Sequence, residues 1–163
     1  MTQATIRPLT PADRDAALGV INTAARWYRE FLPPGEVHEP EMTAAQWEAE
    51  ARRLTWYGAF VSEALAGVMG LEHVRDAALL RHAYVLPESQ RHGIGSRLRE
   101  HLEHQARSAR RIIVGTYAGN YKARAVLEKS GYRLSPDSQA VLRGYYAIPE
   151  DRLRASVTYE KPL

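Results

Sequence analysis

A glycine-rich segment between a strand-like run and a helix-like run restricts the fold of this chain more than any other feature. The segment extends from Val85 to Ser96, and Gly93 and Gly95 fall in the first turn of the predicted helix. A helix N-terminus exposes unpaired N–H groups and a partial positive charge, and glycine lets an anion approach them closely. Arg91 adds further positive charge. The segment therefore predicts a phosphate or pyrophosphate site, with a plain strand-to-helix turn as the alternative.

The rest of the chain alternates strand-like and helix-like patterns. Caps and apolar residues at helical spacing predict helices over 10–28, 43–53, 94–106 and 120–130. Apolar runs between turn residues predict strands over 6–8, 56–61, 65–74, 79–85, 112–117, 132–134 and 155–159. This order predicts one α/β domain over residues 1–163, with a mixed sheet and helices on both faces.

Composition excludes several classes of site. The chain has no cysteine, which rules out disulfides, cysteine-ligated metals and a thiol nucleophile. Its apolar runs are too short to span a membrane, and Met1 to Ile6 lack a signal-peptide pattern, so a cytoplasmic location is expected. The net charge of +3 is small and scattered, which argues against nucleic acid but suits an anionic cofactor.

Two segments of the chain match known sequence motifs. Gln90 to Gly95 reads Gln-Arg-His-Gly-Ile-Gly, and Asn120 to Tyr132 begins Asn-Tyr-Lys-Ala and ends Leu-Glu-Lys-Ser-Gly-Tyr. The first is similar to the Q/R-x-x-G-x-G/A motif of the GNAT superfamily of N-acetyltransferases, and the second resembles that family's N-x-x-A-x-x-x-Y-E-K-x-G-F segment, in the family's order. The resemblance spans most of the chain. It implies the GNAT fold, a mixed and mostly antiparallel sheet of six to seven strands flanked by four helices. It also implies an acyltransferase that uses acetyl-CoA, with no metal, and acts on a primary amine.

The resemblance implies where acetyl-CoA would be held. In the family two strands splay apart, and the pantetheine arm lies between them. Backbone groups of Ala83, Tyr84 and Val85 would bond the arm and polarise the thioester carbonyl. The residues implied to hold the pyrophosphate are Arg91, His92, Gly93, Ile94, Gly95 and Ser96. Asn120 would reach the arm from the other side, with a plain helix N-cap as the alternative.

One position departs from the family pattern. Leu127 occupies the place of the tyrosine that usually serves as general acid, on the helix face that also carries Asn120. Leucine cannot donate a proton, so the acid is unassigned, with Tyr117 or a water as candidates. Direct attack by a neutral amine on the thioester also requires a base.

The candidate bases are Glu39 and His82. Glu39 lies in a loop that in this fold covers the acceptor pocket, and His82 lies beside the implied acetyl site. An imidazole has an unperturbed pKa of about 6.5. Strand alternation places Arg81 and His82 on opposite faces, so only one of them is expected to point into the cleft. Glu72 is a weaker candidate.

Other side chains are interpreted as structural. His101 and His104 lie among charged residues such as Arg99 and Glu103, which indicates a solvated helix face rather than a metal site. Aromatic residues are candidates for lining the acceptor pocket or for the core, and these are Trp56, Tyr57, Tyr145 and Tyr146.

The sequence leaves the acceptor open among a small amine, an amino-acid-like metabolite, an antibiotic and a protein N-terminus. Two other functions are alternatives: an acyl-CoA-binding sensor without turnover, suggested by Leu127, and an acetylating toxin that acts on aminoacyl-tRNA, which should carry a basic face. A homodimer is suggested by the resemblance. No nucleic-acid or membrane partner is expected.

Overall fold

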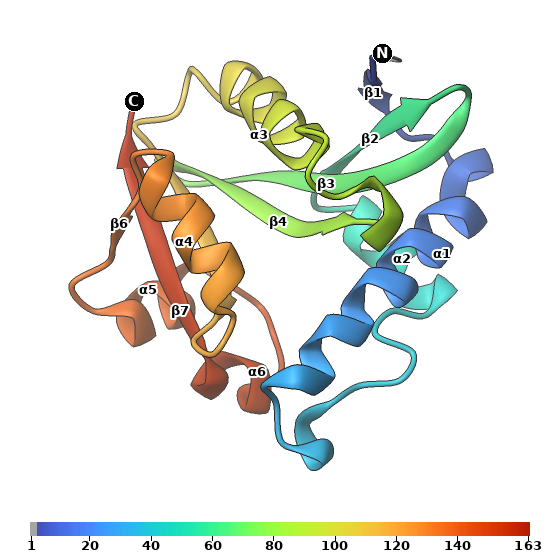
Figure 1. Cartoon of the computed structure of the whole chain (residues 1–163). Helices are drawn as coiled ribbons and strands as arrows, with labels where there is room; N and C mark the ends of the chain where they lie inside the picture. The colour runs from blue at the N-terminus through green and yellow to red at the C-terminus, as the bar shows by residue number, and fades with distance from the viewer. Residues whose placement is uncertain (1–2) are drawn as a thin grey trace.

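The strands form a seven-stranded sheet in the order β1-β2-β3-β4-β5-β7-β6 (Figure 1). The computed structural model describes residues 3–163, so Met1 and Thr2, with which the stretch considered for a signal peptide begins, lie outside the described residues. The strands are β1 (Thr5–Pro8), β2 (Thr55–Val61), β3 (Ala64–Val74), β4 (Ala77–Val85), β5 (Arg111–Tyr117), β6 (Arg133–Leu134) and β7 (Ser156–Pro162). The β4–β5 pair is parallel, and the other neighbouring pairs are antiparallel. The expected mixed, mostly antiparallel sheet of six to seven strands is therefore confirmed.

Six α-helices accompany the sheet in residues 3–163, where four were expected. They are α1 (Arg14–Ala24), α2 (Ala44–Ala51), α3 (Ile94–Gln105), α4 (Tyr121–Lys129), α5 (Ser138–Tyr145) and α6 (Glu150–Ala155). The two additional helices, α5 and α6, lie in a segment for which no helix was predicted. Asp137 caps α5 by accepting from the Ala140 N–H at 3.1 Å, and Leu142 and Leu153 anchor the two helices in the core.

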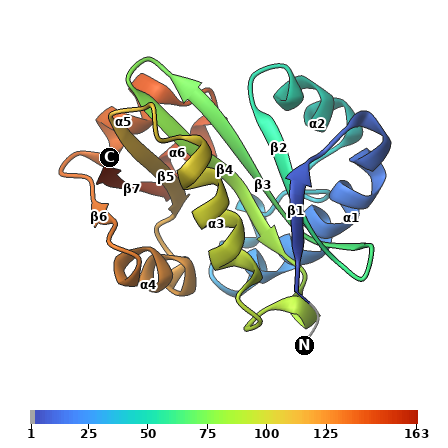
Figure 2. The same ribbon diagram turned by 90° about the horizontal axis from the view of Figure 1, so that it is seen from above.

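The helices cover both faces of the sheet (Figure 2). Side chains of α3 and α4, among them Leu98, Leu102 and Leu127, pack with Ile112 in one core cluster. On the opposite face, α1 and α2 pack against β2, β3 and β4 in a second cluster, and α5 packs against β4 and β5 in a third. The apolar periodicity of the helices accounts for this layering, because each helix buries one stripe against the sheet.

The sheet is interrupted between β4 and β5. Their ladder pairs Ala77 with Arg111 and ends where Leu80 pairs with Val114, although both strands continue beyond that point. The two strands therefore diverge, and this gap positions the site described next. Among residues 3–163, no helix combines the length and apolar content needed to cross a membrane.

Candidate active site

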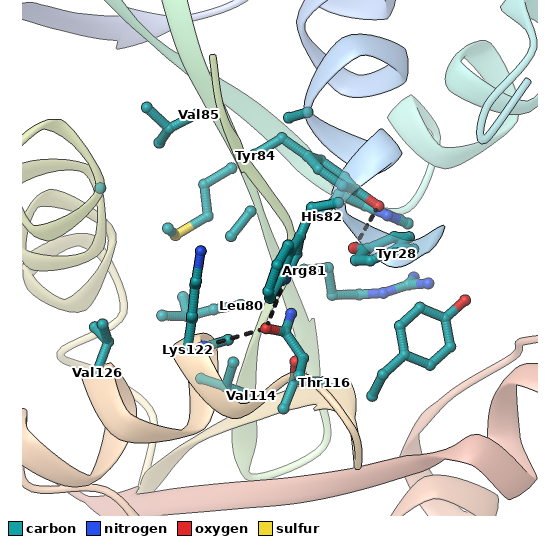
Figure 3. Close-up of a pocket in the computed structure, with 18 of the residues that line it drawn as sticks. Tyr28, Leu80, Arg81, His82, Tyr84, Val85, Val114, Thr116, Lys122 and Val126 are labelled. Carbon is teal, nitrogen blue, oxygen red and sulfur yellow. Dashed lines mark hydrogen bonds between the residues drawn. The ribbon is translucent and has the colours of Figure 1, made fainter. Parts of the chain in front are cut away.

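A cavity of about 1010 Å³ fills the gap between the diverging ends of β4 and β5 (Figure 3). Its walls include β4 from Leu80 to Val85, β5 from Val114 to Tyr117, and the N-terminal ends of α3 and α4. Its other end is lined by residues from three distant segments, Tyr28, Glu41 and Arg152. The cavity thus joins a helix N-terminus to a cluster of ionisable side chains.

The glycine-rich segment forms one end of the cavity. Gly93 is the N-cap of α3 with φ of 76°, a left-handed conformation that favours glycine. A Cβ at Gly93 would meet no atom within 4 Å, and one at Gly95 would meet only Val85 Cγ2, at 3.7 Å. The space above these backbone N–H groups is therefore open to a ligand. Of the implied pyrophosphate residues, Arg91, Gly93, Ile94, Gly95 and Ser96 line the cavity. His92 is exposed and lies outside the lining.

Arg99 also belongs to this end, although it was expected on a solvated face. It lines the cavity, its side chain is only 12% exposed, and its Nε is buried without a hydrogen-bond partner in the described residues. Position 99 lies four residues after Gly95, about one helical turn later, so it lies on the face of α3 that carries Gly95 and borders the cavity. Lys122 of α4 points into the same space, with its Nζ 4.1 Å from the centroid of the Trp27 ring (Figure 3).

Asn120 has the capping role considered as its alternative and lines the cavity as well. Its Oδ1 accepts from the Ala123 N–H at 3.2 Å and from Trp27 Nε1 at 3.0 Å. The side-chain oxygen is thus occupied by protein donors, and the side-chain NH2 is the group left to donate to a ligand.

A bulge in β4 overturns the expectation that Arg81 and His82 face opposite ways. The pairing of β3 with β4 shifts between Val68 and Gly70, and His82 has φ of 55°. A bulge inserts an extra residue and breaks the alternation of side chains. Both residues consequently line the cavity and both contact Glu50.

Glu50 of α2 organises a buried charge cluster. Its carboxylate accepts from Arg81 at 3.2 and 3.3 Å and lies 3.2 Å from His82 Nε2, and Arg81 also donates to Glu72 at 3.0 Å. Burial raises the pKa of Glu50, but the His82 hydrogen bond and the Arg81 charge outweigh it and lower that pKa to about 2. Burial also lowers the pKa of His82, so its imidazole is neutral at pH 7. Because Glu72 accepts the hydrogen bond from Arg81, we interpret it as an ion-pair partner of Arg81 and not as a base.

The other end of the cavity, which Tyr28 and Arg152 also line, contains a carboxylate that sequence reasoning missed. Glu41, in the loop before α2, has a side chain only 4% exposed; it accepts from Arg152 Nη1 at 2.6 Å and from the Tyr84 hydroxyl at 3.4 Å. Tyr84 in turn receives a hydrogen bond from the Tyr28 hydroxyl at 3.1 Å (Figure 3). Burial raises the pKa of Glu41 although Arg152 opposes this. The only local signal was the Glu39-Pro40-Glu41 run, which does not indicate which carboxylate is buried.

The structure does not bring Glu39 to the cavity. Its side chain is 57% exposed, pairs with Arg29 and is absent from the lining. Of the aromatic candidates, Tyr146 lines the cavity, whereas Trp56 and Tyr57 belong to the core. Tyr145 packs in a core cluster and contacts Arg111.

Two positions bear on the missing general acid. Leu127 is buried and lines the cavity, so the place of the family's usual tyrosine is apolar here. Tyr117 lines the cavity at the end of β5, and burial raises its pKa to about 12. Tyr117 is therefore protonated at neutral pH. Within residues 3–163, no group of three or more His, Cys, Asp or Glu side chains is arranged to hold a metal ion.

Comparisons with known proteins agree with this geometry. A family model described as "Acetyltransferase (GNAT) family" matches residues 21–132. No curated protein sequence gives a significant match. The fold is similar to that of PaiA N-acetyltransferase from Thermoplasma acidophilum, crystallised with coenzyme A, at a TM-score of 0.77 and 16% identity over 98% of this chain and 99% of that one.

Two further solved structures share the fold. An acetyltransferase from Thermus thermophilus has a TM-score of 0.74 and 18% identity over the whole of both chains. The ribosomal-protein-S18-alanine N-acetyltransferase from Escherichia coli has a TM-score of 0.71 and 20% identity over 98% of this chain and 93% of that one. With the family model covering most of the chain, this protein belongs to the GNAT family of acetyltransferases and is an acyltransferase.

Proposed function

We propose that this protein transfers the acetyl group of acetyl-CoA directly to a primary amine, within a single domain spanning residues 1–163. One observation carries the proposal: a single cavity connects the open N-terminus of α3, the gap between β4 and β5, and the buried carboxylate of Glu41. Helix N-terminal N–H groups suit a diphosphate, a strand-like gap suits an extended arm with amide groups, and a buried carboxylate suits an amine.

The unpaired edge of β4 supports the position proposed for the cofactor arm. Beyond Leu80, β4 has no strand neighbour on the side of β5, while its opposite edge continues to pair with β3. Backbone groups of Ala83, Tyr84 and Val85 can therefore bond the pantetheine amides. An N–H directed at the thioester oxygen would stabilise the negative charge that develops during attack. Arg91, Arg99 and Lys122 add positive charge for the phosphates.

Two side chains, Glu41 and His82, each accept one proton from the amine. An ammonium acceptor first gives one proton to Glu41 and becomes a neutral amine. Its nitrogen then attacks the carbonyl carbon, forming the C–N bond and an oxyanion. The second N–H proton passes to the neutral imidazole of His82, which Glu50 orients. The C–S bond breaks as the amide forms, and its electron pair leaves with the coenzyme A sulfur.

Tyr117 is the proposed proton donor to the leaving thiolate of coenzyme A. It takes the role of the tyrosine found at the position of Leu127 in other family members. Tyr117 stays protonated at neutral pH and lines the cavity beside the acceptor end. Its hydroxyl can donate a hydrogen bond or a proton to the departing sulfur. Direct transfer also agrees with the lack of cysteine, because no thiol is present to form an acyl-enzyme.

The proposal includes two further properties: the protein forms a homodimer, and it is located in the cytoplasm. Within the chain β7 has neighbours on both sides, β5 and β6, so strand pairing between two copies would use β1 or the two-residue edge strand β6. Sedimentation of the purified protein would test for the dimer.

The experiment is an acetyl-CoA turnover assay against amine acceptors, with release of free thiol measured and the product identified by mass spectrometry. The acceptor panel contains simple amines, amino acids, peptides and an aminoglycoside. Transfer of one acetyl group to an amine nitrogen supports the proposal. Tight binding of acetyl-CoA without turnover on any amine would contradict it and would favour an acyl-CoA sensor.

A further inference from the structure

The acceptor end contains an ion pair whose members both line the cavity. Arg152 of α6 donates from Nη1 to Glu41 Oε2 at 2.6 Å and from Nη2 to the Glu41 carbonyl oxygen at 3.5 Å. Arginine has five N–H donors, so these two contacts leave donors unused. The Nε of Arg152 is buried and has no acceptor in the part of the chain that the structure describes. The Arg152 side chain is 20% exposed and lines the cavity, so an anion there would meet the unused donors of its guanidinium.

The charges on the cavity wall disfavour a polycationic acceptor. Two carboxylates, Glu30 and Glu41, line the cavity, against six cationic side chains: Arg26, Arg81, Arg91, Arg99, Lys122 and Arg152. Arg81 is neutralised by Glu50 and Glu72 behind the wall. At the acceptor end this leaves the Glu41–Arg152 pair, with no excess of negative charge to attract several ammonium groups.

We propose that the acceptor is an amino acid, bound with its amine at Glu41 and its carboxylate on Arg152. This inference rests on the proposed function and assigns the substrate class of that site. The fork of a guanidinium matches a carboxylate and can bond it through two donors. Because Glu41 and Arg152 are in direct contact, the two charged groups of the acceptor must lie on the same carbon or on neighbouring carbons.

The proton balance favours such an acceptor over a simple amine. When the ammonium of an amino acid gives its proton to Glu41, the Glu41 side chain becomes a neutral carboxylic acid. The carboxylate of the acceptor then remains to pair with Arg152. When a simple amine does the same, Arg152 loses its partner and is left as a buried unpaired charge, which is strongly unfavourable. Burial raises the pKa of Glu41, which eases this proton transfer.

The test compares matched acceptors with acetyl-CoA as donor. The panel is glycine, β-alanine and the common L-amino acids, each beside its carboxamide and its decarboxylated amine. We expect kcat/KM for at least one acid to exceed that for its carboxamide by 10-fold or more, the size of a charge-assisted hydrogen bond. A carboxamide has the more readily deprotonated amine, so a preference for the acid cannot come from amine basicity.

Arg152→Gln tests the assigned residue. It removes the ion-pair partner of Glu41, so both acceptors should lose activity, but kcat/KM for the acid should fall about 10- to 100-fold further than that for the carboxamide, mainly through KM. Arg152→Lys should recover part of the preference for the acid. Arg143→Gln is the matched control, because it removes an exposed arginine–glutamate pair with Glu150 on the neighbouring helix, outside the cavity. Unchanged acetyl-CoA binding would show that each variant is folded.

The outcomes separate this inference from the proposed function. Turnover of amines, carboxamides or peptides as fast as acids, or an equal loss for acid and carboxamide in Arg152→Gln, would overturn the inference and leave acetyl transfer intact. Turnover of no panel acceptor and of no simple amine or peptide would overturn both.

Discussion

Arg152 and Glu41 lie 111 residues apart in the chain, yet the guanidinium of the first donates to the carboxylate of the second at 2.6 Å. A second contact joins the same two segments, since His38 Nε2 lies 2.9 Å from Asp151 Oδ2. The loop before α2 is thereby held against α6. The acceptor end of the cavity is thus assembled from two segments that lie outside both GNAT-like motifs.

Replacing the carboxylate of Glu41 tests its role as the first proton acceptor. Glu41→Gln keeps the shape of the side chain and should lower kcat/KM by about 100-fold or more, as loss of a general base does. Glu39→Gln is the control, because Glu39 is exposed and outside the cavity. Equal activity of the two variants would show that Glu41 does not take the proton.

The kcat/KM of the wild-type protein should depend on pH through the ionisation of Glu41. Burial raises its pKa above the usual glutamate value, and only the ionised form accepts a proton. The acidic limb of kcat/KM should therefore include an ionisation at a pKa above 4.5, and Glu41→Gln should remove this ionisation while leaving that of His82. A limb at or below the ordinary glutamate pKa, unchanged in the variant, would contradict the assignment.

Glu50 should make the folded state sensitive to acid. Its pKa is lowered from 4.5 to about 2 in the folded protein, so its contribution to stability is present above pH 4.5 and is lost as pH falls toward 2. Glu50→Gln should lower the free energy of unfolding at pH 7 by about 3 kcal/mol and flatten its dependence on acid. Denaturant titrations at several pH values measure both.

Glu48→Gln provides the control on the same helix, because the Glu48 side chain is 54% exposed and pairs with Arg14 at the surface. Its effect should stay within about 0.5 kcal/mol. Stability curves of Glu50→Gln and the wild type that run parallel from pH 7 to pH 3 would disprove the role given to the Glu50 cluster.

The assignment of the leaving-group donor can be tested by rescue. Tyr117→Phe removes the hydroxyl and should reduce kcat by about 10-fold or more, with little change in acetyl-CoA affinity. Adding Leu127→Tyr to this variant restores a hydroxyl at the family's usual position and should recover turnover. Tyr121→Phe is the control, since Tyr121 is exposed. Full activity of Tyr117→Phe would leave the thiolate without a protein donor.

A carboxylate introduced at the N-terminus of α3 tests whether the diphosphate of acetyl-CoA binds there. Gly95→Glu introduces no left-handed strain, and its Cβ would make only an ordinary contact with Val85. It should weaken acetyl-CoA binding by at least about 100-fold through bulk and repulsion of the diphosphate. Gly93→Glu should do the same with added backbone strain. Gly35→Glu, in open space away from the cavity, should bind normally.

The parts of the site formed by contiguous residues could be predicted from the sequence. Gly93 requires a left-handed conformation, Asn120 caps α4, and both follow from local rules that the sequence displays directly. The strand pattern likewise predicts the sheet. A local motif contains its own geometry, so the end of the cavity at the N-terminus of α3 could be located from the sequence, while its role as the cofactor site stays a prediction.

The acceptor end could not be predicted in the same way. The burial of Glu41 depends on Arg152, and no pattern in the sequence reveals such a distant pair. The bulge at His82 breaks the alternation rule that any strand prediction assumes. The helices α5 and α6 are short, and helices of this length depend on tertiary packing: α5 packs against β7, and α6 packs against α5.

Calorimetric titration of the wild-type protein with coenzyme A and acetyl-CoA decides whether the cavity holds the cofactor. The geometry predicts saturable binding of one molecule per chain, with a dissociation constant in the range of about 1 to 100 μM, typical of enzyme substrates. Absence of binding at millimolar concentrations of either compound would contradict the cofactor site and the acetyl transfer derived from it.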